Sequence, residues 1–218
     1  MKLKQLESYL QNVENFDEPK IEFEQYPTTP HLASRIIYTA ENVFQDIQGK
    51  TIADLGCGCG MLTIASLLME ADFVTGIDID KDAIEILQNN LDEYEISESA
   101  EIICANLSKS SSKKELLLDT NLLDKMHKKF DTVVMNPPFG TKPGNAGIDM
   151  LFLEAAVYLS KGAIYSLHKS STRDYIIKTC KKWGYSCEVL AQLKFDIPKM
   201  YNFHKKNSVD INVDLIPN

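Results

Sequence analysis

The sequence has little of what marks a secreted, disulfide-stabilised or membrane-spanning protein. Only 5 of its 218 residues are Cys, an odd number at irregular spacing, which argues against a disulfide framework and favours a reducing compartment. No apolar run approaches the roughly 20 residues of a membrane span, and the charged, amphipathic start MKLKQLESYL does not resemble a secretory leader. We therefore expect a soluble protein of the nucleus and cytoplasm, with no membrane partner.

Positive charge is also scarce. The sequence has 23 Lys and Arg residues and 31 Asp and Glu residues, which gives a net charge of -8. Taken alone, this balance argues against binding to nucleic acid. The distribution is uneven, however: residues 1–160 hold 13 basic and 26 acidic side chains, whereas residues 161–206 hold 10 basic and 3 acidic ones. The basic segment forms either one electropositive face or ordinary solvated surfaces, and the sequence leaves both open.

The arrangement of apolar residues indicates the fold. From residue 50 onward, short apolar runs alternate with helix-period segments, which predicts parallel strands joined by helices. The expected strands are residues 51–55, 73–77, 101–104, 132–135 and 163–167, and the expected helices are residues 3–13, 30–44, 61–69, 81–94, 148–159 and 172–183. Alternating patterns at 187–197 and 208–216 predict an antiparallel pair. The sequence thus predicts an α/β fold with a wound, mostly parallel seven-stranded sheet that ends in an antiparallel hairpin.

A glycine-rich turn, ADLGCGCG at residues 53–60, follows the first expected strand. It lies at the carboxyl end of that strand, where wound sheets bind ligands. Glycine lets the backbone approach a ligand closely, but the G-x-G-x-G spacing that starts at Gly56 differs from the G-x-G-x-x-G of dinucleotide folds. We expect a ligand crevice here, and a plain tight turn is the alternative.

The second expected strand is followed by an acid, Asp78, 22 positions after Gly56. A carboxylate at this point can accept hydrogen bonds from the hydroxyl groups of a ribose. The alternative is structural, because Asp78 or Asp80 could cap the helix that starts with KDAIEIL. The sequence alone leaves both interpretations open.

The most specific pattern is Asn136-Pro137-Pro138-Phe139, at the end of the fourth expected strand. Because proline fixes φ and has no N–H, Pro137 and Pro138 lock an extended turn that presents acceptors without competing donors. The Asn136 side-chain oxygen and the Pro137 carbonyl can accept from one planar exocyclic amine, while Phe139 offers a stacking face. Two acceptors favour the partly positive nitrogen that forms as the amine attacks. The matching electrophile is a methyl sulfonium in the glycine crevice.

Two further pairs have simpler interpretations. Cys57 and Cys59 are too close to chelate a metal easily and have no Cys or His cluster beside them, so no metal site is expected. Ser166 and His168 stand two apart on an expected strand, and the sequence identifies no acid beside them. This pattern favours a wall of the active site over a nucleophile pair.

The segment formed by Phe203, His204, Lys205 and Lys206 lies between the last two expected strands. It is either a solvated hairpin tip or a contact for single-stranded RNA. An aromatic ring beside two lysines suits RNA through base stacking and phosphate contact.

Taken together, the motifs resemble a known family. The NPPF turn is similar to that of class I S-adenosylmethionine-dependent amino methyltransferases, and five motifs in order resemble the methyltransferase-like protein five family over essentially the whole chain. These motifs are FEQYPT at 23–28, ADLGCGCG at 53–60, MNPPFGTK at 135–142, YSLHKSST at 165–172, and FHKK, SVDI and VDLI within 203–216. The resemblance implies a Rossmann-like methyltransferase domain at 46–218, with 1–45 as a helical cap and cofactor lid, in one structural unit.

The resemblance also implies an S-adenosylmethionine site. In that site Gln25 and Thr28 close over the cofactor from the N-terminal part, while Gly56, Cys59 and Met61 line its methionine side.

The same resemblance places the ribose of the cofactor on Asp78. The family usually has an Asp after the third strand that accepts from the adenine amine, whereas this chain has Asn106, followed by Leu107. An Asn can accept through its oxygen but loses the charge-assisted bond. We expect weaker cofactor binding as a result.

The resemblance implies methylation of N6 of one adenosine in 18S ribosomal RNA, by direct transfer and without a metal. Two alternatives remain: methylation of a glutamine in a translation factor, which uses the same turn, and an inactive module that only binds RNA. The basic segment 161–206 favours RNA over a protein substrate, and the intact Asn136–Phe139 turn favours an enzyme.

The third expected strand, within residues 100–106, predicts a partner. In the strand order usual for this class it lies at an edge, and it is apolar at Ile102, Ile103 and Cys104, with no Pro or Lys to block pairing. The resemblance implies that a small zinc-binding methyltransferase activator protein adds its own strand there. The alternative is an interior strand that is covered on both faces.

Overall fold

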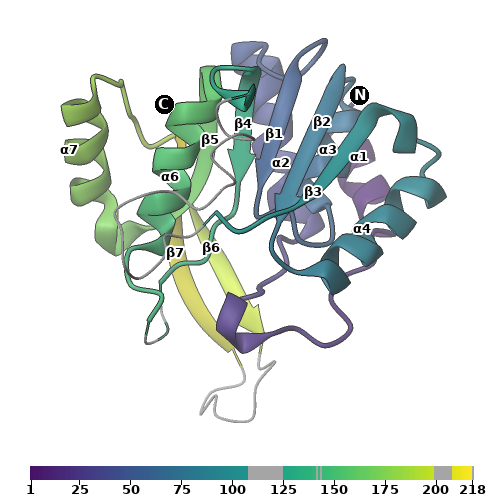
Figure 1. Ribbon diagram of the computed structural model, residues 1–218, viewed down its shortest axis with the longest axis horizontal. Coiled ribbons are helices and arrows are strands. Elements are labelled where there is room, and N and C mark those ends of the chain that lie inside the picture. Colours follow the sequence, from purple (N-terminus) through teal and green to yellow (C-terminus); the bar gives the residue numbers. More distant parts are fainter. Residues whose placement is uncertain (108–124, 141, 143, 199–207, 218) are drawn as a thin grey trace.

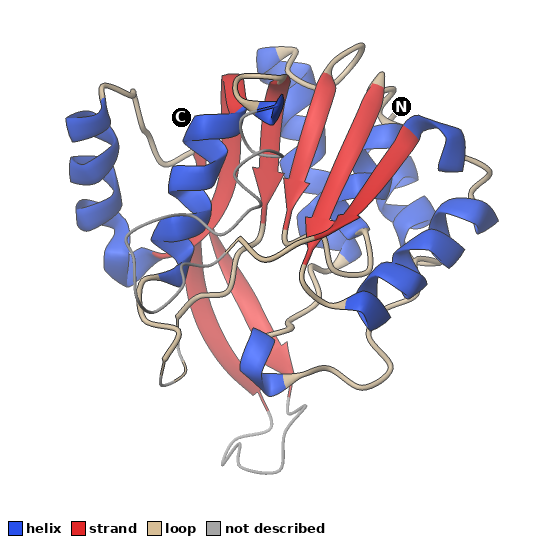
Figure 2. Ribbon diagram, viewed as in Figure 1, coloured by secondary structure: helices blue, strands red, loops and turns tan. Residues whose placement is uncertain are grey.

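A seven-stranded sheet organises the chain, and helices cover both of its faces (Figures 1 and 2). The computed structural model describes residues 1–107, 125–140, 142, 144–198 and 208–217. The strand order is β3-β2-β1-β4-β5-β7-β6. Five strands are parallel: β1 (Thr51–Leu55), β2 (Phe73–Asp78), β3 (Ala100–Cys104), β4 (Phe130–Met135) and β5 (Ser160–Lys169). Two antiparallel strands, β6 (Ala191–Pro198) and β7 (Ser208–Pro217), complete it beyond β5.

The helices begin and end at residues that suit helix termini. They are α1 (Leu3–Leu10), α2 (Pro30–Phe44), α3 (Met61–Leu68), α4 (Lys81–Glu93), α6 (Ile148–Leu159) and α7 (Arg173–Trp183), with 3-10 turns η1 (Ile21–Phe23), η2 (Ser97–Ser99) and η3 (Ser170–Thr172). Thr29 caps α2 by accepting from the Leu32 N–H, and Pro30 takes the first helical position. Gly184 ends α7 with a φ of 85°, a value that glycine adopts readily.

Two hydrophobic clusters fill the space on either side of the sheet. The first joins α1, α2, α3 and α4 to one face and includes Leu6, Ile36, Ile52, Ile64 and Leu87. The second joins α6 and α7 to the other face and includes Leu55, Met135, Leu153, Ile164 and Ile176. Because helices cover both faces, the central strands β1, β2 and β4 are mostly buried, whereas the edge strand β3 is partly exposed.

The predicted α/β architecture is confirmed, and the strand β3 lies at an edge as expected. Some element ends differ. The expected strand 163–167 begins earlier, at Ser160, because its backbone passes close to β4: a Cβ on Gly162 would lie 2.4 Å from the Asp131 carbonyl oxygen. The expected helix 3–13 ends at Leu10, and the strand expected at 187–197 begins at Ala191.

Parallel strands bring the ends of β1, β2, β3 and β4 to the same edge of the sheet. The glycine-rich turn, Asp78, Asn106 and Asn136 follow these four strands in that order. This edge therefore gathers the residues that the sequence singles out. Among the described helices, none has the length and apolar character needed to cross a membrane.

Candidate functional site

The glycine-rich turn wraps around the end of β2. The N–H groups of Gly56 and Cys57 both donate to the Ile77 carbonyl, at 2.8 and 3.2 Å. Gly60 has a φ of 92°, and a Cβ there would lie 2.0 Å from Leu87 Cδ1. The turn therefore needs glycine at residue 60, because both the backbone conformation and the packing of α4 exclude a side chain.

Asp78 is held in place by two backbone donors. Its Oδ2 accepts from the Gly58 N–H at 2.8 Å and its Oδ1 accepts from the Asp80 N–H at 2.9 Å. Asp80, rather than Asp78, caps α4 by accepting from the Asp82 N–H, so the capping alternative for Asp78 is wrong. Burial raises the pKa of Asp78. Each carboxylate oxygen retains a second lone pair that can accept from a ligand.

The side chain of Asn136 is oriented by the N-terminal part of the chain. Its Nδ2 donates to Thr28 Oγ1 at 2.9 Å, which leaves Oδ1 facing away from Thr28. Within the described residues, this buried Oδ1 has no hydrogen-bond partner. A buried acceptor without a partner is costly unless a ligand supplies a donor. The geometry therefore suits an incoming amine, which is the role that the sequence predicts for Asn136.

The segment 11–29, which we call the N-terminal link, crosses this edge of the sheet, and two further sets of contacts besides the Thr28–Asn136 bond hold it there. In the first, Gln25 Nε2 donates to Asp80 Oδ2 at 2.6 Å, and Lys20 Nζ forms an ion pair with Asp80 and Asp82. Although burial opposes ionisation, these bonds hold the pKa of Asp80 below its usual value. Gln25 thus anchors the N-terminal link to the start of α4.

In the second set of contacts the N-terminal link meets the loop that follows the NPPF turn. Asn145 Nδ2 donates to Glu24 Oε1 at 3.0 Å and to the Glu22 carbonyl at 3.1 Å, and the Lys142 N–H donates to Glu24 Oε1 at 3.2 Å. Glu24 has a φ of 50° and is buried. These contacts close the N-terminal link over the sheet edge.

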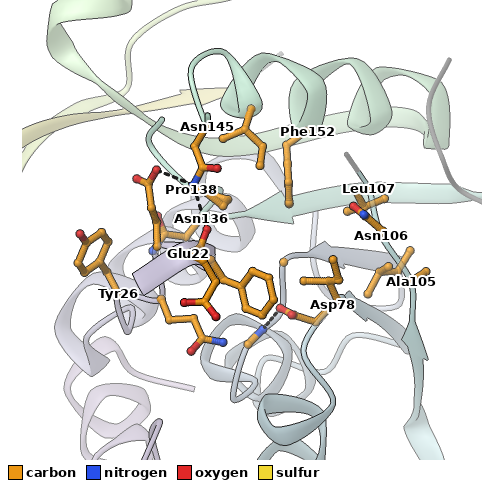
Figure 3. Close-up of a pocket in the computed structure, with 18 of the residues that line it drawn as sticks. Glu22, Tyr26, Asp78, Ala105, Asn106, Leu107, Asn136, Pro138, Asn145 and Phe152 are labelled. Carbon is orange, nitrogen blue, oxygen red and sulfur yellow. Dashed lines mark hydrogen bonds between the residues drawn. The ribbon is translucent and has the colours of Figure 1, made fainter. Parts of the chain in front are cut away.

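Beneath the N-terminal link lies a cavity of about 340 Å³ (Figure 3). Asp78, Asn106 and Leu107 lie on one side of it, and Asn136 and Pro138 lie on another (Figure 3). Of the predicted site residues, its lining contains Gln25, Gly56, Asp78, Asn106, Leu107, Asn136 and Pro138. An adjoining cavity of about 50 Å³ is lined by Thr28, Gly56, Cys59, Met61 and Asn136. The structure therefore brings together the predicted cofactor residues and two of the four predicted catalytic residues.

Phe139 is buried next to the site, and its stacking role stays a prediction. It is 3% exposed and belongs to the first hydrophobic cluster, and the described linings of the two cavities do not include it. Pro137 is likewise outside both linings. The predicted RNA contacts Phe203, His204 and the two lysines after them lie outside the described residues.

The cysteines of the glycine-rich turn are buried thiols. Burial raises the pKa of Cys59 to about 12, so it is a neutral thiol at neutral pH. In the described part of the chain, no group of three or more His, Cys, Asp or Glu side chains could hold a metal ion.

The chain has relatives among known proteins. The chain is 50% identical to the rRNA N(6)-adenosine-methyltransferase METTL5 of Danio rerio, over 99% of this chain and 98% of that protein. It is 46% identical to the rRNA N(6)-adenosine-methyltransferase Mettl5 of Drosophila melanogaster, over 98% and 94%. The chain belongs to the METTL5 family. The sequence resemblance is thereby confirmed.

Broader comparisons give the same fold for this METTL5 family member. A crystal structure of a candidate RNA methyltransferase from Pyrococcus horikoshii superimposes with a TM-score of 0.77 and 31% identity, over 100% of this chain and 97% of that one. The family model for ribosomal protein L11 methyltransferase (PrmA) matches residues 30–136. The match runs from α2 to Asn136, and so contains the glycine-rich turn and Asp78.

Sequence reasoning missed several residues that line the two cavities. Phe16 lines both cavities, and a Cβ on Gly58 would lie 3.0 Å from its ring. Tyr26, Asn145 and Phe152 also line the larger cavity. Their roles depend on contacts with distant segments, so local patterns carry no signal for them. Tyr26 alone lies within a quoted motif, FEQYPT.

Asp54 was also missed, although it directly precedes the Leu55-Gly56 step of the turn. It is fully buried; its Oδ2 accepts from Thr63 Oγ1 at 2.7 Å, while its Oδ1 has no partner among the described residues. Burial raises the pKa of Asp54 to about 7. The position of this acid, at the end of the first strand and just before the glycines, is the sequence feature that could have identified Asp54 as a site residue.

The interpretation of Ser166 and His168 needs a correction. An acid does lie beside His168, because Asp149 Oδ2 at the start of α6 is 3.3 Å from its Nδ1. The sequence could not show this, since the two residues meet only when α6 packs on β5. Both His168 and Ser166 are completely buried, and neither lines the two cavities, so they lie behind the site rather than in its wall.

Proposed function

We propose that the protein transfers a methyl group from S-adenosylmethionine to N6 of an adenosine in ribosomal RNA, specifically in the 18S RNA of the small subunit. Its METTL5 relatives are named rRNA N(6)-adenosine-methyltransferases, which supports the reaction and the class of RNA. The observation that carries the proposal in this chain is the buried, unpartnered Oδ1 of Asn136, a residue that lines a cavity next to the glycine-rich turn. The small-subunit target rests on the family resemblance.

The residues of the cavity fit S-adenosylmethionine. Asp78 has free lone pairs for the ribose hydroxyls, and Asn106 and Leu107 line the cavity beside it, where an adenine would lie. The free Oδ1 of Asp54 suits the ammonium group of the methionine part. The cofactor, when bound, supplies a methyl group that is open to attack by a nucleophile.

On the substrate side, the Asn136 oxygen and the Pro137 carbonyl would accept from the adenosine amine. As the nitrogen attacks, its lone pair would form the new bond to the methyl carbon while the carbon–sulfur bond breaks, so that S-adenosylhomocysteine leaves and the nitrogen becomes partly positive. Acceptors already in position stabilise this charge without reorganisation. Thr28 holds the Asn136 amide, and thereby the direction of its oxygen. The proton that the amine loses passes to solvent.

The proposal is tested by supplying the purified protein with labelled S-adenosylmethionine together with total RNA and total protein. We expect N6-methyladenosine in small-subunit ribosomal RNA, identified by mass spectrometry of digested nucleosides. The Asn136→Ala variant serves as the inactive control. Label that appears on glutamine of a protein, with none in RNA, would contradict the proposal and favour the alternative substrate.

A partner at the edge strand β3 is a second part of the proposal. Among the described strands, β3 pairs only with β2, so its outer edge has unpaired backbone groups. Glu101 and Cys104 are exposed on it, and neighbouring Ile79 is 41% exposed, so apolar surface lies beside the edge. A small zinc-binding methyltransferase activator protein could add a strand here and cover that surface.

Backbone amide exchange measures this pairing. When the activator is added, exchange at residues 101–105 should slow by about 10-fold or more, because each ladder hydrogen bond protects an amide. Amides of the interior strand β1 provide the control and should not change. Ile103→Pro removes a backbone donor and should abolish the protection. If residues 101–105 are as protected alone as in the mixture, the edge has no such partner.

A further inference from the structure

Helix α7 presents a basic face to solvent. Tyr175, Lys178, Lys181 and Lys182 are all exposed, and we call them the α7 basic face. Their spacing of three, four and seven residues puts them on one side of a helix. On the opposite side, Ile176 and Cys180 are buried in the second hydrophobic cluster. Packing therefore fixes the rotation of α7 and directs these four residues outward.

The charges of this face have no ion-pair partner among the described residues. The only acid of α7 is Asp174, in the first turn, where the helix dipole favours it. Tyr175 is 62% exposed, the highest exposure among the aromatic residues of the described surface. Three free cations and an uncovered ring thus share one surface of a protein whose net charge is -8.

The position of α7 connects this face with the candidate site. β5 lies beside β4 and runs parallel to it, so both end at the edge where Asn136 lies. α7 follows β5 directly through η3 and then runs back along the flank of the molecule, outside α6 (Figure 1). Its 11 residues span about 16 Å at the usual rise of 1.5 Å per residue. The α7 basic face therefore extends from near the sheet edge that holds the candidate site along one flank of the molecule.

We infer that the α7 basic face binds the phosphate backbone of the RNA that flanks the target adenosine, with Tyr175 stacking on an unpaired base. The inference rests on the proposed function and adds a surface to it. Lysines are typical phosphate contacts, and an exposed aromatic ring among them suits a single-stranded base rather than an acidic protein surface. The excess of basic residues after residue 160 would then be, at least in α7, a functional surface and not only a solvated one.

The test compares RNA binding by two triple variants with equal loss of charge. The first is Lys178→Gln with Lys181→Gln and Lys182→Gln. The control is Lys2→Gln with Lys4→Gln and Lys50→Gln; Lys2 and Lys4 lie beside and in α1, and Lys50 directly precedes β1. The dissociation constant for a 30-nucleotide single-stranded RNA that contains the target adenosine is measured from 50 to 300 mM salt. Melting temperature and S-adenosylmethionine affinity are measured in parallel, and neither should change.

We expect the α7 triple variant to bind RNA about 10-fold more weakly and to lose roughly 2 units of log–log salt slope, because each phosphate contact contributes about 0.7 unit for a single strand. The control triple variant should keep the wild-type slope. Tyr175→Leu should weaken binding by about 5-fold or more, since base stacking is lost. Tyr175→Phe keeps the ring and should bind as the wild type does.

Three results would overturn the inference. Equal salt slopes for the two triple variants would show that the α7 lysines are only solvated. Equal binding by Tyr175→Leu and Tyr175→Phe would exclude stacking. An α7 variant that binds RNA normally but no longer binds poly-glutamate would assign the face to an acidic protein. Failure of the proposed function is distinguishable, because then the wild-type protein itself forms no N6-methyladenosine.

Discussion

Replacing Asn136 with alanine is expected to lower kcat by about 100-fold or more, as the loss of one preorganised transition-state partner usually does. The affinity for S-adenosylmethionine should change little, because the cofactor contacts proposed above come from Asp78, Asp54 and the residues after β3. Steady-state kinetics on the RNA substrate and calorimetry of cofactor binding give the two values. Turnover equal to that of the wild type would contradict the acceptor role of Asn136.

Thr28 offers a matched control for this prediction. Thr28→Val has nearly the same shape but no hydroxyl to accept from Asn136 Nδ2, whereas Thr28→Ser keeps one. If the orientation of the amide matters, Thr28→Val should lower kcat by about 10-fold, in line with one lost hydrogen bond of roughly 1.4 kcal/mol, and Thr28→Ser should restore most of it. Equal kcat for the two variants would show that Thr28 does not orient Asn136.

The second large effect is expected at Asp78. Asp78→Ala removes the acceptor proposed for both ribose hydroxyls and should weaken S-adenosylmethionine binding by roughly 1.5 to 3 kcal/mol, which corresponds to about 10- to 150-fold in the dissociation constant. Calorimetric titration measures it. Glu85→Ala, an exposed acid on α4, removes the same charge outside the cavity and should leave the affinity unchanged.

Asp78 also receives the Gly58 and Asp80 N–H groups, so its loss could disturb the glycine-rich turn itself. Asp78→Asn separates the two effects, since its amide oxygen can still accept from one of these donors. We expect Asp78→Asn to lower the melting temperature less than Asp78→Ala does, and still to lose cofactor affinity. Unchanged affinity in both Asp78 variants would contradict the ribose assignment.

Much of the site could be predicted from local patterns because its chemistry is carried by short motifs. The NPPF turn presents acceptors through the fixed φ of Pro137 and Pro138, whatever the rest of the fold. The glycines at 56–60 and the acid after β2 follow strands whose apolar runs are visible in the sequence. Parallel strands bring these motifs to one edge of the sheet. The sequence predicted the parallel arrangement through its alternation of strands and helices.

Other features arise only from contacts between segments far apart in the chain. Gln25 was expected over the cofactor, and the structure shows its amide bound to Asp80, 55 residues away. Phe139 was expected as a stacking face, but it is buried in the first hydrophobic cluster. A side chain on a local motif can turn toward a ligand or into the core, and only the space left by neighbouring elements decides between them.

From the sequence by itself came the order of strands and helices, the edge position of β3, the acid after β2 and the acceptor role proposed for Asn136. Those conclusions rest on periodicity, on the backbone limits of glycine and proline, and on motif resemblance. The tertiary structure alone decided that Thr28 orients Asn136, that Glu24 joins the N-terminal link to Asn145, and that Asp149 lies beside His168. Each of these pairs forms between separate elements of the chain. The distances within a pair therefore depend on how the helices and the N-terminal link pack on the sheet, and not on residues adjacent in the sequence.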